Sequence, residues 1–151
     1  MGGFTLPPAS VLWFTLCAFL MTAALCAIFT MLALLNQNKA VVAVVCISLA
    51  YFLLFLGIYF NSRLTEQAVI PAREYIENGQ ILVREAMPNP AYVQGLKRAI
   101  FEALYDLPGC QAVQLIAAAE ARPIRLPLVS LGAAAASTAA GLALFRRKDL
   151  K

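Results

Sequence analysis

The order of apolar and polar positions divides the chain into two long apolar runs, a mixed segment and an alanine-rich run. Residues 11–35 contain no charge, and residues 40–60 form a second uninterrupted apolar run. About 20 apolar residues suffice for a helix to cross the hydrocarbon core of a bilayer. Because only the tetrad NQNK at 36–39 separates the runs, the two helices must be antiparallel neighbours. We predict a transmembrane hairpin over 11–60, preceded by an extended lead-in over 1–10.

The mixed segment, 61–126, predicts extramembrane helices. We expect the second helix to leave the membrane and to end at Pro71, which cannot donate to the helix ladder. The stretch AREYIENG at 72–79 then predicts two helical turns that end at the Asn-Gly pair, a common helix C-terminus. The stretch CQAVQLIAAAEA at 110–121 predicts one more short helix.

An amphipathic helix is predicted over 90–107. Asn89 is its expected N-cap, Pro90 lies in its first turn, and a Pro-Gly pair follows it. Its lysine, arginine and acidic residues lie mostly off the apolar face, and Arg98 and Glu102 have the spacing of a helical ion pair. A helix with one apolar face must place it on a membrane surface, on its own chain or on a partner. The partner-docking candidates on this face are Val93, Leu96, Ile100, Leu104 and Leu107.

The alanine-rich run at 127–145 is a marginal membrane span. It carries no charge and is bracketed by Arg125 and by the basic tail at 146–151. Its leucines, valine and phenylalanine contribute on the order of −2 to −3 kcal/mol to insertion, and its glycines, serines, threonine and proline oppose it. The sum lies near zero, so we predict a third transmembrane helix that is buried among protein neighbours. An alanine-rich soluble helix is the alternative.

Small residues recur at helical spacing in all three runs. Such faces let helices approach closely in lipid, where no hydrophobic force joins them. The alternative is that threonine and alanine are simply common in membrane spans. The helix-packing candidates are Thr15, Ala18, Thr22, Cys26, Thr30, Ala43, Cys46, Ala50, Gly57, Gly132, Ala136, Ser137 and Gly141.

Composition agrees with an all-α integral membrane protein. The chain of 151 residues is 62% hydrophobic and 13% charged, against about a quarter charged in an average globular protein. Between positions 1 and 61 the only charged side chain is Lys39. The net charge of +4 comes from membrane-flanking lysines and arginines rather than from a basic stripe, so nucleic-acid binding is not expected. With three spans, Lys39 and the basic tail share one side, and a slight excess of basic residues there favours the cytoplasmic or matrix side.

The candidate chemistry is sparse. The chain has no histidine, and its four cysteines form no CxxC pair, so we expect no metal and no cofactor. The carboxylate pairs Glu74 with Glu77 and Glu102 with Asp106 are interpreted as solvated surface charge. No phosphate-binding loop or nucleophile motif occurs, and no ionisable residue lies inside a predicted span.

These observations favour a non-catalytic accessory or structural subunit of a larger membrane complex. Its expected partners are other integral membrane subunits and lipids, with no small-molecule substrate. By frequency alone the expected home is an energy-transducing membrane, first the mitochondrial inner membrane (a respiratory-chain or ATP synthase complex), then a thylakoid or bacterial inner membrane. The alternative is a self-assembling pore or secretion-channel component that resembles a holin, and a membrane enzyme or carrier ranks third.

Overall fold

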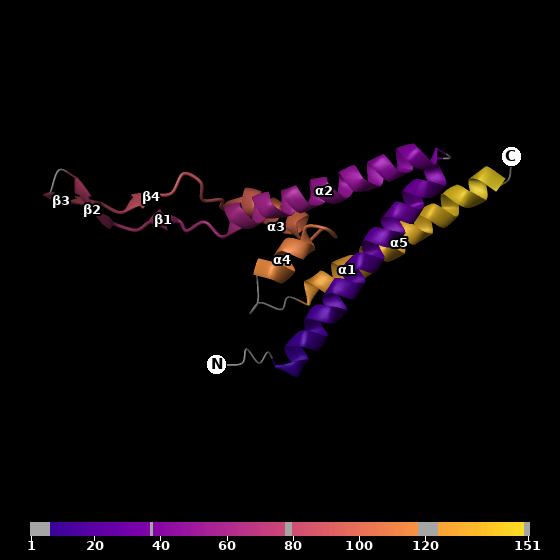
Figure 1. Ribbon diagram of the computed structural model, residues 1–151, viewed down its shortest axis with the longest axis horizontal. Coiled ribbons are helices and arrows are strands. Elements are labelled where there is room, and N and C mark those ends of the chain that lie inside the picture. Colours follow the sequence, from indigo (N-terminus) through magenta and orange to yellow (C-terminus); the bar gives the residue numbers. More distant parts are fainter. Residues whose placement is uncertain (1–6, 37, 78–79, 118–123, 150–151) are drawn as a thin grey trace.

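The computed structural model describes residues 7–36, 38–77, 80–117 and 124–149 (Figure 1). Helices dominate, and one protruding ribbon of short strands interrupts them. The helices within these residues are α1 (Pro8–Leu35), α2 (Lys39–Leu64), α3 (Gly95–Tyr105), α4 (Gln111–Ala117) and α5 (Arg125–Asp149). The strands are β1 (Val69–Ile70), β2 (Arg73–Glu77), β3 (Gln80–Arg84) and β4 (Met87–Pro88).

Among the described residues, three helices are long and apolar enough to cross a membrane. They are α1, α2 and the Arg125–Arg146 part of α5, with mean hydropathies of 2.4, 2.8 and 1.8. Each of these helices contains one of the apolar runs predicted from the sequence. Pro8 begins α1 where a missing N–H costs nothing, and the Asn38 side chain caps α2 by accepting from the N–H groups of Ala40 and Val41. Membrane insertion of these helices is inferred from their length and apolar composition, which are also the grounds for it in the sequence.

The long helices form an open V. α1 packs along α5, and the two run in the same direction, so the end of α5 lies near the turn between α1 and α2 (Figure 1). From that turn α2 diverges from the α1–α5 pair. α3 and α4 occupy the open side of the V, against the later part of α2 and against α1. Their contact with α2 forms the main hydrophobic cluster, which contains Leu53, Phe60, Tyr105 and Cys110.

The segment after α2 does not form the helices that were predicted there. α2 ends at Leu64 rather than at Pro71, and residues 73–77 form a strand rather than two helical turns. β2 pairs antiparallel with β3, with Tyr75 opposite Leu82, and β1 pairs with β4 nearer the helices. The prediction failed because Asn-Gly between two runs rich in Ile, Val and Tyr is also the strongest signal for a β-hairpin turn. Residues 78–79 themselves lie outside the described residues.

The amphipathic helix begins later than predicted. α3 starts at Gly95, with Gln94 as N-cap, instead of at Pro90. The Asn89 side chain instead binds the segment that follows α2: its amide donates to Glu66 Oε2 (2.9 Å) and to the Gln67 carbonyl (3.0 Å). Asn89 therefore holds the base of the ribbon. α4 covers 111–117 of the helix predicted over 110–121, and residues 118–121 lie outside the described part of the chain.

Candidate functional site

Small residues are buried where α1 packs along α5. On α1, however, they are not the residues that helical periodicity predicted. Cys17 and Ala24 are the buried residues of α1, and Ser130 and Gly141 are buried on α5. A Cβ at Gly141 would lie 3.8 Å from the Cα of Met31, so a glycine there permits a close approach of the two backbones.

The predicted stripe on α1 lies mostly outside this seam. Thr15, Thr22, Cys26 and Thr30 are exposed, and Ala18 is half-buried. The three threonine hydroxyls donate to the carbonyl four residues earlier, at 2.8 Å each, so they are satisfied within their own helix. Whether this stripe packs against another chain stays a prediction.

The packing candidates on α2 and α5 are also partly buried and partly exposed. On α2, Gly57 is buried, Cys46 and Ala50 are half-buried, and Ala43 is exposed. On α5, Gly141 is buried and Ser137 half-buried, whereas Gly132 and Ala136 are exposed. Gly57 packs against the turn between α3 and α4 rather than against another long helix, because a Cβ there would lie 2.9 Å from the Cα of Cys110.

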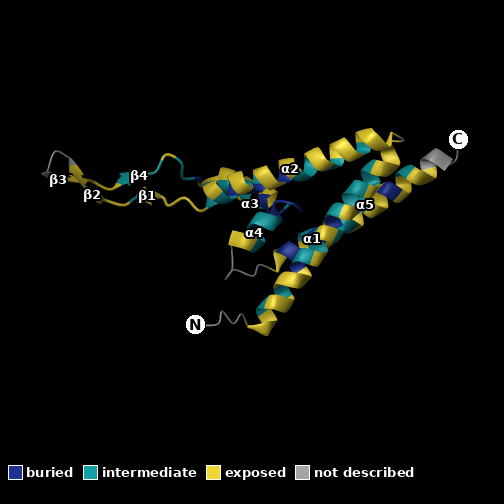
Figure 2. Ribbon diagram, in the orientation of Figure 1, coloured by how far each residue is buried: buried dark blue, intermediate teal, exposed yellow. Residues whose placement is uncertain are grey.

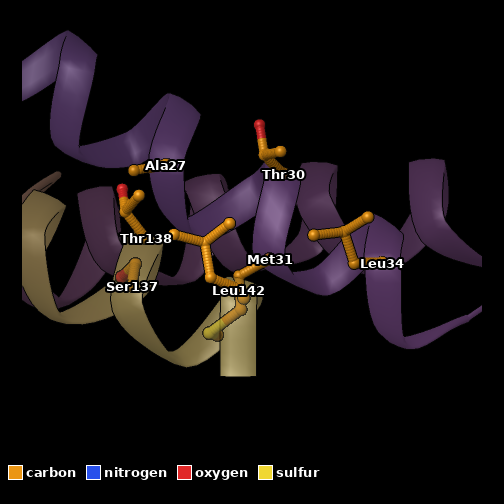
Figure 3. Close-up of a pocket in the computed structure, with 8 residues that line it drawn as sticks. Ala27, Thr30, Met31, Leu34, Ser137, Thr138 and Leu142 are labelled. Atoms are coloured by element: carbon orange, nitrogen blue, oxygen red, sulfur yellow. The ribbon is translucent and has the colours of Figure 1, made fainter. Parts of the chain in front are cut away.

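A groove of about 240 Å³ lies along the α1–α5 seam (Figure 3). Thr30 and Thr138 border it, but both hydroxyls donate to carbonyls of their own helices, at 2.8 Å. Ala27, Met31 and Leu142 supply most of the remaining surface. The groove therefore offers little but apolar contact.

The most distinctive chemistry is a cluster of buried polar groups that joins α3, α4 and α5, which we call the polar joint. It consists of Tyr105, Asp106, Gln111, Gln114, Arg125 and Ser130. Asp106, Gln111, Gln114 and Ser130 are each less than 8% exposed. Charged and amide side chains are rarely buried to this degree unless they are paired.

Gln111 is the centre of the polar joint. Its amide nitrogen donates to the carbonyl of Asp106 (2.7 Å) and to that of Leu126 (3.2 Å), while its oxygen accepts from Ser130 Oγ (2.8 Å). These bonds connect the end of α3 to the start of α5 through one side chain. The bond to the Asp106 carbonyl also satisfies an acceptor at the C-terminal end of α3, where a helix leaves its carbonyls without partners.

Asp106 carries the only charge of the polar joint that is buried. Its carboxylate faces Arg125 Nε at 3.2 Å and accepts from Gln114 Nε2 at 3.1 Å. Gln114 also donates to the carbonyl of Tyr105, at 2.6 Å. An ion pair and an amide therefore fix this carboxylate, which corrects its interpretation as solvated surface charge. Glu102, its predicted partner, pairs with Arg98 at 3.1 Å, as the helical spacing predicted.

Tyr105 of the polar joint and Cys110, which is not a member, are weak acids held in their neutral forms. Burial, with smaller contributions from Cys110 and Asp106, raises the pKa of Tyr105 to about 12. Burial raises the pKa of Cys110 to about 11, although its own backbone opposes the shift. Tyr105 donates to Asn61 Oδ1 (2.9 Å), and Cys110 Sγ donates to the Leu53 carbonyl (3.1 Å). Both groups remain protonated at neutral pH and act as hydrogen-bond donors that tie the α3–α4 turn to α2.

The turn between α3 and α4 enters the V to the level of the apolar part of α2. Leu53 and Gly57, which touch residues 109 and 110, precede Phe60 by seven and three residues, or about 10 and 5 Å along the helix axis. If α2 spans a membrane, irregular backbone at this level needs internal hydrogen-bond partners. The polar joint supplies them. Sequence reasoning overlooked it, although two glutamines three residues apart in the apolar stretch 110–119 were a usable signal.

The docking candidates belong to two different surfaces. Val93 is buried, at 4% exposed, and Leu107 packs against the core cluster. Leu96, Ile100 and Leu104, four residues apart, are 79%, 48% and 39% exposed. α3 thus has a core face, completed by Phe101 and Tyr105, and an unoccupied apolar stripe. Sequence periodicity alone did not distinguish the core face from the exposed stripe.

Within the described ranges, no three histidine, cysteine, aspartate or glutamate side chains are grouped so that they could hold a metal ion. Comparisons of the chain with protein-family models, with curated proteins and with solved structures find no match.

Proposed function

We propose that this chain is a non-catalytic accessory subunit of a larger membrane complex, anchored by three spans and attached to a neighbouring subunit through its ribbon. The observation that carries the proposal is the β2–β3 ribbon, which extends away from the helices in line with α2 (Figure 1). If α2 spans a membrane, the ribbon projects from the bilayer surface.

The ribbon lacks the support that a free hairpin needs. Within the described residues its strands form only two-stranded pairings, and such a hairpin is marginally stable in water by itself. Its apolar side chains are open on both faces: Tyr75 and Leu82, which are paired, are 47% and 38% exposed, and Ile76 is 77% exposed. A partner surface that covers these side chains would stabilise the ribbon and hold the subunit in place.

The long helices support the same proposal. Only 6%, 11% and 11% of the residues in the three apolar windows are buried within the chain (Figure 2). The open V leaves most of α2 free to contact lipid or helices of other subunits. The polar joint contributes by fixing the α3–α4 pair, from which the stripe of Leu96, Ile100 and Leu104 projects.

The test is co-migration of the tagged chain on native electrophoresis after solubilisation of its own membrane in mild detergent. The wild type should migrate with a large hetero-complex. The variant Ile76→Glu/Val83→Glu, which places charges on one face of the ribbon, should be released from it. The matched control Glu74→Gln/Glu85→Gln changes two exposed ribbon residues without adding a charge, and it should stay bound.

Two results would contradict the proposal. A ladder of homo-oligomers would favour a self-assembling pore, and a free monomer in the native membrane would exclude both functions. Because the altered side chains are exposed, the glutamate variant should keep the helical circular dichroism of the wild type. Loss of co-migration with retained helicity therefore reports docking rather than unfolding.

A further inference from the structure

A second, mainly polar cleft lies where the start of α3 meets the last turns of α2, on the ribbon side of the molecule (Figure 1). Its volume is about 170 Å³. The lining residues that carry functional groups are Tyr59, Arg63, Tyr92 and Lys97, with Phe101 below them. Neither the polar joint nor the ribbon uses this cleft.

Two cations border the cleft without an anion. Arg63 and Lys97 form no ion pair within the described residues, where the only salt bridges are Arg98–Glu102 and Arg125–Asp106. Aromatic rings hold the two cations in place: Arg63 Cζ lies 5.6 Å from the centroid of Tyr59, and Lys97 Nζ lies 5.6 Å from that of Phe101. The two cations of the cleft thus have no carboxylate partner among the described residues.

The neighbouring carboxylates are already engaged. Glu66 accepts from the Asn89 side chain at 2.9 Å, and Glu102 is held by Arg98 at 3.1 Å. Arg98 lies beside the cleft, with its guanidinium 5.9 Å from the ring centroid of Tyr92, but its charge is balanced by Glu102.

The start of α3 strengthens the positive field. No side chain caps this helix, and its first turn holds no acidic residue. Uncapped N–H groups and the helix dipole favour an anion at this end. Lys97 lies in that first turn, where the dipole disfavours a cation, so an anion would relieve two unfavourable features at once.

We propose that this cleft binds a phosphate group. Arg63 and Lys97 supply charge-assisted hydrogen bonds, and the hydroxyls of Tyr59 and Tyr92 are further donors. Arg63 follows the end of the apolar run of α2 by three residues, which is the level of lipid headgroups if α2 spans the bilayer. The phosphate can therefore belong to an anionic lipid or be free in solution. The site does not depend on docking to another subunit.

The experiment uses the full chain in mild detergent and two variants of equal charge. Arg63→Gln/Lys97→Gln removes the cations of the cleft, and Arg73→Gln/Arg84→Gln removes two arginines from the ribbon. Native mass spectrometry measures retention of added phosphatidylglycerol against phosphatidylcholine. A second arm measures the shift of the unfolding temperature on adding inorganic phosphate.

The wild type should retain phosphatidylglycerol in preference to phosphatidylcholine. The cleft variant should lose at least about tenfold in this preference, since one hydrogen bond to a charged group contributes that much, and the ribbon variant less than about twofold. A response to inorganic phosphate that only the cleft variant loses would assign a free phosphate and would equally support the site.

Equal losses in the two variants, or no response to either probe, would overturn the proposal. If the double cleft variant fails to fold, Lys97→Gln alone decides, because this side chain is exposed and its removal leaves the packing of α2 and α3 intact. That single variant should still lose several-fold in preference, and an unchanged preference would exclude the site.

Discussion

Two glycines set how closely the α3–α4 turn approaches α2. Gly109 has a φ of 97°, a left-handed conformation that L side chains rarely adopt, and a Cβ there would lie 2.8 Å from the Cβ of Leu53. Gly57 presents a bare backbone to the Cα of Cys110. The turn can therefore reach the apolar part of α2 only because both positions lack a side chain.

Replacement of Gly57 by alanine should weaken the fold. The added Cβ would lie 2.9 Å from a backbone carbon of Cys110 and 3.1 Å from Val113 Cγ2, so the turn must move. Overpacking of this kind costs about 1–3 kcal/mol of unfolding free energy. The control is Gly132→Ala in α5. A Cβ there meets nothing within 4 Å, and alanine has a higher helix propensity than glycine. Denaturant unfolding in detergent should show a lower unfolding free energy for Gly57→Ala than for Gly132→Ala. Equal stability of the two variants would contradict the close contact of Gly57 with the α3–α4 turn.

Stability should fall at alkaline pH because of two weak acids, Cys110 and Tyr105, the second of which belongs to the polar joint. The pKa of Cys110 rises from 9.0 to about 11 on folding, and that of Tyr105 from 10.0 to about 12. The folded state thus binds more protons than the unfolded state across this range, so the stabilisation is complete below about pH 9 and is lost progressively up to about pH 12.

The measurement is the unfolding free energy against pH in detergent. Cys110→Ser keeps a donor for the Leu53 carbonyl but removes the thiol that titrates, so its decline between about pH 9 and 11 should be shallower. An identical slope in wild type and variant would show that Cys110 does not contribute.

At the scale of elements, the sequence predicts the three long helices well, because an uncharged run of about 20 residues has few alternatives. The short elements between them depend on context. Residues 73–84 carry strand-forming residues and an Asn-Gly pair, yet Asn-Gly also ends helices, and pairing decides between the two. The hairpin signal is therefore present in this stretch, but the local pattern alone does not decide between the two interpretations.

The faces of the helices were harder to predict than the helices themselves. Small residues surround α1 on several sides, so periodicity alone could not select Cys17 and Ala24 over the threonine stripe. The buried role of Asp106 depends on Arg125, 19 positions away, and on Gln114. Long-range partners of this kind follow from the return of α5 beside α1, which no local signal contains.

At the scale of the whole molecule, the parallel course of α1 and α5 requires an odd number of crossings between them. If all three helices cross a membrane, α2 supplies this crossing in the opposite direction and the chain passes through the membrane three times. The turn between α1 and α2 then lies on the same side as the end of α5, and the ribbon lies on the other (Figure 1). A two-pass chain would place the ribbon and the end of α5 together.

Cysteine labelling of sealed membranes tests this topology. The native cysteines give a low background, since Cys110 and Cys17 are buried and the other two lie within the apolar helices. Asn36→Cys and Arg146→Cys should react with a membrane-impermeant maleimide from one side, and Glu85→Cys only from the opposite side. All three positions are exposed, so each should react after the membrane is dissolved. Reaction of Glu85→Cys and Arg146→Cys from the same side would exclude α5 as a span and would leave the helix lying outside the bilayer.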